Sequence, residues 1–272
     1  MDKKARADRN YEGGLGVIGA IVFIFGLVVG SFLNVCVYRL PKNESIITPR
    51  SHCVSCGKTI PWYDNLPLVS FLLLRGRCRF CKKRISILYF VIELLTALIF
   101  LALFTHFGLS IETVIFAALA SALVVVSFID LKIQEIPDEI TLPGIGVGII
   151  LCFVFPGVIS QDTHLSGLLH SALGALVGGA VIYLMGVLGE LLFKKEAMGG
   201  GDVKLMAMMG AFLGWKLILL TFFLAPFFGS VVGIILKIKN KQDVIPYGPH
   251  LSIAGIACLF WGEKILNTIL FY

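Results

Sequence analysis

Long apolar runs, separated by short polar segments, dominate the hydropathy pattern of this chain. A membrane-crossing helix needs about 20 predominantly apolar residues. Spans of that kind are predicted at 15–38, 88–107, 111–129, 140–159, 167–193 and 250–270. The stretch 203–236 is too long for one crossing, and the break at Gly214-Trp215-Lys216 divides it into a short span and a full one. The pattern therefore predicts an all-α polytopic membrane protein with about eight transmembrane helices.

One long polar segment interrupts these runs. It covers residues 39–87, between the first two predicted helices, whereas residues 1–14 are polar, of mixed charge, and predicted to form a tail. The first apolar run is long enough to span a bilayer, so we expect no cleavable signal peptide. We therefore expect three parts: the tail 1–14, a first helix with its polar loop at 15–87, and a multi-helix membrane domain at 88–272.

The distribution of Lys and Arg predicts the orientation of the chain. The loop 39–87 contains ten of them, and with eight spans the loops at 130–139, 194–202 and 237–249 fall on the same side. Because Lys and Arg accumulate in cytoplasmic loops, we place these loops in the cytoplasm and both termini outside, although the basic tail weakly favours the reverse. The composition, 57% hydrophobic and 15% charged, is too apolar for a soluble domain. The net charge of +6 arises from these loops and does not indicate a nucleic-acid partner.

Four cysteines in the polar loop form two C-x2-C pairs, Cys53/Cys56 and Cys78/Cys81. This spacing is typical of a structural four-cysteine zinc site. Disulfides or free thiols are the alternatives, and a cytoplasmic loop disfavours disulfides because thiols stay reduced there. Four thiolates close the coordination sphere, so the zinc would be structural. The aromatic segment 61–67 between the pairs either packs on the zinc fold or lies at the membrane interface.

Two aspartates lie at the ends of apolar runs on the predicted cytoplasmic side. Asp130 ends one run, and Asp202 follows three glycines and begins another. A charged side chain inside a membrane costs about 3 kcal/mol on insertion scales, so such residues are usually functional. Two carboxyls that share one proton can act as base and acid in aspartic peptide hydrolysis. Asp202 alone could equally be a helix cap, and Asp138 competes with Asp130 for the first catalytic position.

Several segments, in order from about residue 26 to 262, resemble the type IV prepilin peptidases of the GxGD aspartic protease class. The likeness is carried by 30–41, both cysteine pairs, 61–70, 128–138, 199–204 and 246–249. It implies that Asp130 and Asp202 are the catalytic pair, and so selects Asp130 over Asp138. It also implies that the cysteine loop belongs to an N-methyltransferase part that uses S-adenosylmethionine. No glycine-rich cofactor pattern is present, and Glu44 is a weak candidate for binding that donor.

The resemblance further implies a multi-pass enzyme of the bacterial inner membrane, in contact with lipids, whose catalytic face is cytoplasmic. Its substrates would be type IV prepilins or pseudopilins, cleaved after a glycine that ends a basic leader and then N-methylated. Gly199 and Gly201 would let the substrate backbone approach closely, with Lys204 in support. We expect Glu135, Asp138 or Glu139 to attract the basic leader.

An ion-coupled transporter that uses Asp130 and Asp202 is the alternative function. That hypothesis gives no account of the four-cysteine loop. Both acids are also predicted at one membrane face, whereas transporter sites usually lie near the bilayer midplane.

Overall fold

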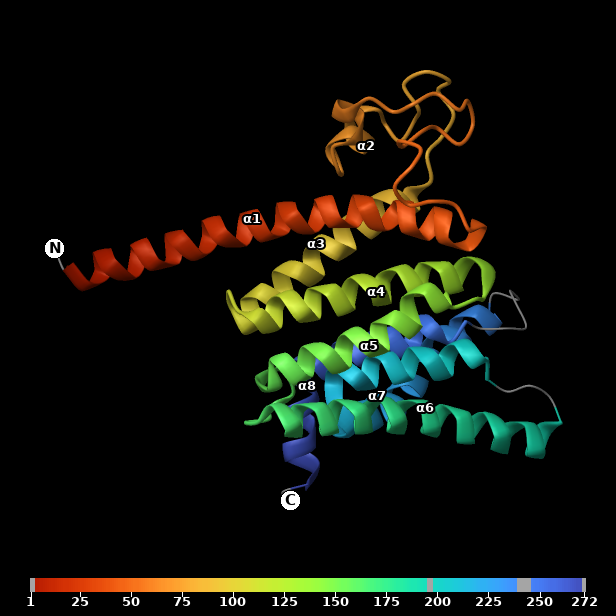
Figure 1. Ribbon diagram of the computed structural model, residues 1–272. Helices are drawn as coiled ribbons and strands as arrows, with labels where there is room; N and C mark the ends of the chain where they lie inside the picture. The colour runs from red at the N-terminus through yellow and green to blue at the C-terminus, as the bar shows by residue number, and fades with distance from the viewer. Residues whose placement is uncertain (1–2, 195–197, 239–245, 271–272) are drawn as a thin grey trace. The chain divides into compact units, whose positions relative to one another are not determined.

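The computed structural model describes residues 3–194, 198–238 and 246–270 (Figure 1). Within these ranges the chain is helical and contains no β-strand, only isolated bridges at His52–Thr59 and Arg77–Arg84. The helices are α1 (Lys3–Arg39), η1 (Leu40–Lys42), η2 (Trp62–Asn65), α2 (Val69–Leu73), α3 (Ile87–Phe107), α4 (Ile111–Ile133), α5 (Asp138–Val154), η3 (Pro156–Ile159), α6 (His164–Phe193), α7 (Gly200–Ile238) and α8 (Gly248–Leu270). They form two compact units, Met1–Val125 and Val126–Tyr272.

Five described segments are long and apolar enough to cross a membrane: Gly16–Lys42, Ile87–Phe107, Ile111–Ile133, His164–Leu192 and Gly200–Ser230. The all-helical membrane fold predicted from the sequence is therefore confirmed in outline. α5 and α8 do not meet the same criterion of length and hydropathy. The count of eight spans accordingly stays a prediction.

Two predicted boundaries differ from the structure. Residues 3–14 do not form a separate tail but are the first turns of α1. The segment is rich in Lys, Ala and Arg, which favour helix, and it contains no proline. The span predicted at 140–159 ends as an α-helix at Val154 and continues as η3. Pro156 explains this end, because proline lacks an N–H and restricts the residue before it.

In the N-terminal unit, α1 packs along α3 (red to orange and yellow in Figure 1). The buried Asn34 side chain donates a hydrogen bond of 3.1 Å to the carbonyl of Tyr89, at the start of α3. The buried carboxylate of Glu93 accepts one of 2.8 Å from the backbone N–H of Leu68. The first bond joins α1 to the start of α3, and the second attaches the loop between these helices to the second turn of α3.

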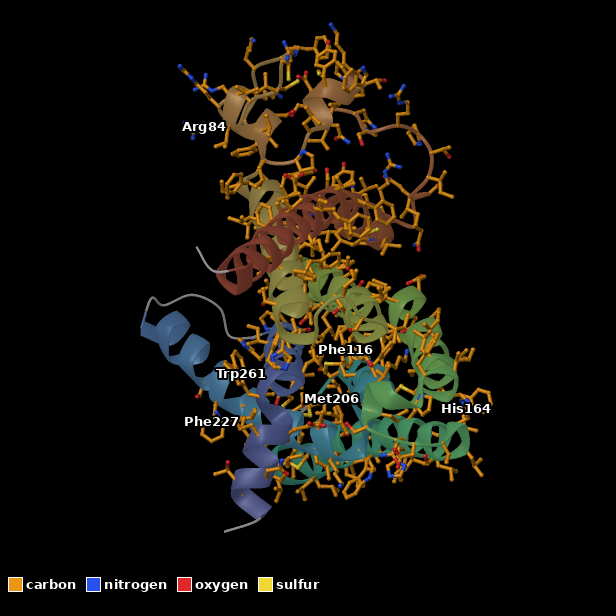
Figure 2. All side chains as sticks on the ribbon, turned by 90° about the vertical axis from the view of Figure 1, so that its left-hand side faces the viewer. Arg84, Phe116, His164, Met206, Phe227 and Trp261 are labelled. Atoms are coloured by element: carbon orange, nitrogen blue, oxygen red, sulfur yellow. The ribbon has the colours of Figure 1, made fainter. Side chains whose placement is uncertain are left out.

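In the C-terminal unit, α6 and α7 approach most closely at two glycines. A Cβ atom at Gly174 or Gly210 would collide with the carbonyl oxygen of the other, so only glycine allows this contact. α7 is broken at Gly214, where φ is 75° and ψ is 170°. This confirms the break predicted at that position. Met206, labelled in Figure 2, is fully buried among the helices of this unit.

Candidate active site and metal centre

Asp130 lies in the last turn of α4 and is 5% exposed. Its Oδ2 accepts a buried hydrogen bond of 2.9 Å from the backbone N–H of Gly248. Gly248 is the first residue of α8, and the first N–H groups of a helix have no partner within the helix. The C-terminal end of one helix thus places its carboxylate against the N-terminal end of another.

Asp202 is the third residue of α7 and is partly buried. Its Oδ2 accepts a hydrogen bond of 3.3 Å from the backbone N–H of Gly199, just before the helix. An acidic side chain at this position that reaches back to the preceding N–H is a recognised capping arrangement. The capping role considered from the sequence is therefore present, and it holds the carboxyl in a fixed place.

The structure brings the two predicted acids together within the C-terminal unit, where Asp130 and Asp202 interact electrostatically. Burial, and secondly the charge of Asp202, raise the pKa of the Tyr247 phenol. Gly248 thus donates to Asp130, and Tyr247 lies within electrostatic range of Asp202. Sequence reasoning quoted this Tyr-Gly segment only as part of the family likeness and did not recognise it as part of the site. The indication in the sequence was Gly248, which lies just before the helix predicted at 250–270, on the same predicted membrane face as the two acids.

The residues predicted to support the site lie around the start of α7. The Lys204 Nζ is 2.7 Å from both carboxylate oxygens of Asp138, the first residue of α5. A Cβ atom at Gly201 would lie 2.8 Å from the Cβ of Ile136, so this glycine permits a close approach. At Gly200 a Cβ atom would meet nothing within 4 Å. The turn that carries Asp202 is therefore fastened to the segment 136–138 by two contacts.

The other predicted residues are exposed. Glu135 and Glu139 flank Asp138 and face solvent, and in the described part of the chain no cation pairs with either. Glu44 is exposed in the turn after η1, where its backbone N–H bonds the Arg39 carbonyl. Nothing in its surroundings identifies a binding site for S-adenosylmethionine.

The four predicted cysteines come together in the N-terminal unit. Their sulfur atoms all lie within 4.8 Å of one another, and those of Cys53 and Cys81 are 3.8 Å apart. Tetrahedral zinc with Zn–S bonds of about 2.3 Å requires sulfur–sulfur separations of roughly 3.8 Å. The described donor set therefore fits one tetrahedral metal ion.

The two cysteine pairs have the same backbone geometry. The carbonyl of Cys53 accepts from Gly57 N and that of Cys78 accepts from Lys82 N, at 2.8 and 3.0 Å. Gly57 and Lys82 both have positive φ, 69° and 57°. Each pair is thus presented by a tight turn.

The thiols differ in acidity. A hydrogen bond from the Cys81 backbone lowers the pKa of Cys78 to about 7. A backbone hydrogen bond at Lys58 favours the Cys56 thiolate, but desolvation and the neighbouring sulfurs raise the pKa of Cys56 to about 11. Four sulfurs this close cannot all ionise without a cation between them.

Two models of known protein families match this chain. Residues 24–107 match the bacterial peptidase A24 N-terminal domain, and residues 116–234 match the type IV leader peptidase family. The first match contains all four cysteines and the second both aspartates. The chain belongs to the type IV leader peptidase family.

Several curated relatives carry the name prepilin leader peptidase/N-methyltransferase. The protein from Pseudomonas putida is 36% identical over 267 residues, which cover 89% of this chain and 90% of the relative. That from Myxococcus xanthus is 42% identical over 236 residues, covering 84% of this chain and 68% of the relative. The Pseudomonas aeruginosa protein is 36% identical, covering 91% of each. No solved structure matches this chain significantly.

Proposed function

We propose that this protein cleaves the basic leader of type IV prepilins or pseudopilins and then N-methylates the new N-terminus. The observation that carries the proposal is the pair of electrostatically coupled carboxyls, Asp130 and Asp202, each held at a helix end by a backbone N–H group. Membership of the leader peptidase family supports the same conclusion. The site would lie at the cytoplasmic face of the inner membrane, where a basic leader meets an apolar helix.

In the proposed reaction, one carboxylate removes a proton from a water molecule, which attacks the scissile carbonyl carbon. The other carboxyl, protonated, donates its proton to the carbonyl oxygen. The tetrahedral intermediate then collapses as a proton moves to the leaving amine, and the peptide C–N bond breaks. The hydrogen bonds from Gly248 to Asp130 and from Gly199 to Asp202 each engage Oδ2. In the proposed reaction, Oδ1 of each acid would face the water and the substrate.

The segment 134–139 would receive the leader. Asp138 is already paired with Lys204, so its charge holds the start of α7. Glu135 and Glu139 are exposed on either side of it and would attract the leader's Lys and Arg side chains. Of the three acids predicted for this role, we assign it to these two, and we assign positioning of Asp202 to Asp138 and Lys204.

The four cysteines would hold a structural zinc ion that stabilises the loop between α1 and α3. S-adenosylmethionine would supply the methyl group for the second reaction. The two matched turns described above would orient the cysteine side chains toward that ion.

The test is leader cleavage by the purified full-length protein, followed by mass spectrometry of the pilin N-terminus. Asp130→Asn and Asp202→Asn should each abolish cleavage, while Asp162→Asn, a matched change in an exposed loop, should leave it intact. Continued cleavage by either site variant would refute the acid pair. Proton uptake by proteoliposomes that depends on the same residues, without cleavage, would instead favour the transporter.

A further inference from the structure

The cysteine loop carries an apolar face that nothing in its own unit covers. Within α2, Val69, Leu72 and Leu73 are exposed, by 50, 63 and 78% respectively. They occupy positions i, i+3 and i+4, which lie on one face of a helix. Trp62 in the preceding η2 is 72% exposed. The hydroxyl of Ser70 donates to the Tyr63 carbonyl at 3.0 Å, so η2 and α2 are fastened together.

The opposite face of α2 is attached to a membrane helix. Phe71, on the other side of α2 from Val69, packs on Phe90 of α3 with ring centroids 5.6 Å apart. Leu68, just before α2, is bonded to Glu93. Along α3, Phe90 lies about 5 Å and Glu93 about 9 Å from the first residue of the helix, because an α-helix rises about 1.5 Å per residue. α2 therefore lies beside the first two turns of a membrane-spanning helix, and its apolar face points away from that helix.

The first turns of a membrane-spanning helix lie near the boundary between lipid headgroups and acyl chains. Interfacial helices bury their apolar face about 5–10 Å into that boundary. On α3 itself, the exposed side chains at the same level are also apolar, Ile87, Leu88 and Val91. The start of α3 and the outer face of α2 therefore both expose apolar side chains.

The charge of the loop matches an anionic leaflet. Residues 39–87 contain ten Lys and Arg but only two acids, Glu44 and Asp64. Six of the ten residues from Arg75 to Arg84 are basic, and Figure 2 shows nitrogen-tipped side chains gathered around Arg84. Asp64 is already paired with Arg79. Basic clusters next to a membrane helix attract anionic headgroups, whereas the same charge would repel the basic leader of a prepilin.

We propose that η2 and α2 form an interfacial anchor that inserts its apolar face into the anionic cytoplasmic leaflet and holds the metal centre at the membrane surface. Of the two locations considered for the aromatic segment 61–67, this assigns the membrane interface. The inference concerns the loop alone and does not depend on the acid pair.

The test uses tryptophan fluorescence of the full-length protein in nanodiscs. With Trp62, Trp215 and Trp261 replaced by Phe, a single tryptophan is introduced by Leu73→Trp, or by Val54→Trp as the matched control. Val54 is exposed in the first cysteine turn of the same loop, outside the apolar face. A third protein keeps only the native Trp62, so that the unaltered α2 is also measured.

Brominated phospholipids should quench the Leu73→Trp and Trp62 signals at least threefold more than the Val54→Trp signal, and aqueous iodide should show the reverse order. The lipid quenching should be stronger with phosphatidylglycerol than with phosphatidylcholine alone. Equal iodide access at the two introduced positions would overturn the anchor. Protection from both quenchers would also overturn it, because it would show a contact with another protein copy. Quenching independent of lipid charge would overturn the assigned role of the basic residues.

Discussion

Replacing Gly248 by alanine tests how tightly the acid pair depends on α8. A Cβ atom at this position would lie 2.7 Å from Oδ2 of Asp130 and 3.3 Å from its Cγ. To regain ordinary contact the carboxylate must retreat by roughly 0.7 Å, away from the N–H that now binds it. Weakening a hydrogen bond to a charged group costs about 1.5–3 kcal/mol. At about 1.4 kcal/mol per factor of ten, we expect kcat for leader cleavage to fall roughly 10- to 100-fold.

The assay is the initial rate of prepilin cleavage over a range of substrate concentrations. The KM should change little, because the substitution alters the position of a reacting group and leaves the substrate-facing surface as it is. Gly146→Ala in α5 is the matched control, since a Cβ atom there would meet nothing within 4 Å. Thermal unfolding of both variants checks that the fold is kept. A Gly248→Ala protein that is folded and cleaves within threefold of the wild-type rate would refute the role of α8.

Three further perturbations separate the remaining roles. Lys204→Met and Asp138→Asn should each lower kcat about 3- to 10-fold. The double variant should be no worse than either single variant, because the two groups act as one pair. Additive losses in the double variant would contradict this pairing. Reversing Glu135 and Glu139 to Lys should raise the KM for a basic leader more than for a neutralised one, and an equal rise would exclude the leader contact. Chelation of the metal, or Cys78→Ser, should abolish methylation and leave cleavage of prepilin largely intact. Metal analysis and the mass of the pilin N-terminus measure these effects. Parallel loss of both activities would show that the loop also supports the acid pair.

The sequence was sufficient to predict those features whose pattern lies within a short segment of the chain. Two C-x2-C pairs predict the four-cysteine cluster, since each turn is complete within six residues. The excessive length of 203–236 and the residues at its middle predicted the break at Gly214. The meeting of Asp130 and Asp202 could be expected from loop polarity, because the same membrane face limits how far apart they can be.

Contacts between distant segments could not be found in this way. Gly248 is 118 residues from Asp130, which accepts its hydrogen bond. Hydropathy predicts how deep a helix end lies in the membrane, but it does not predict which other helix end lies next to it. The ion pair between Asp138 and Lys204 also joins distant segments. Charge alone did not distinguish Asp138 from Glu135 and Glu139, so the sequence did not show which of the three acids pairs with Lys204. The helical state of residues 3–14 was missed because polarity was given more weight than helix propensity.

The division of the chain into two units has an evolutionary consequence. Both aspartates and their backbone donors belong to Val126–Tyr272, whereas the four cysteines belong to Met1–Val125. Under the proposed function, selection for leader removal would act on the part of the gene that encodes 126–272, and selection for methylation on the part that encodes 1–125. Substitutions in one part would then accumulate, or a lineage would lose one activity, without a compensating change in the other.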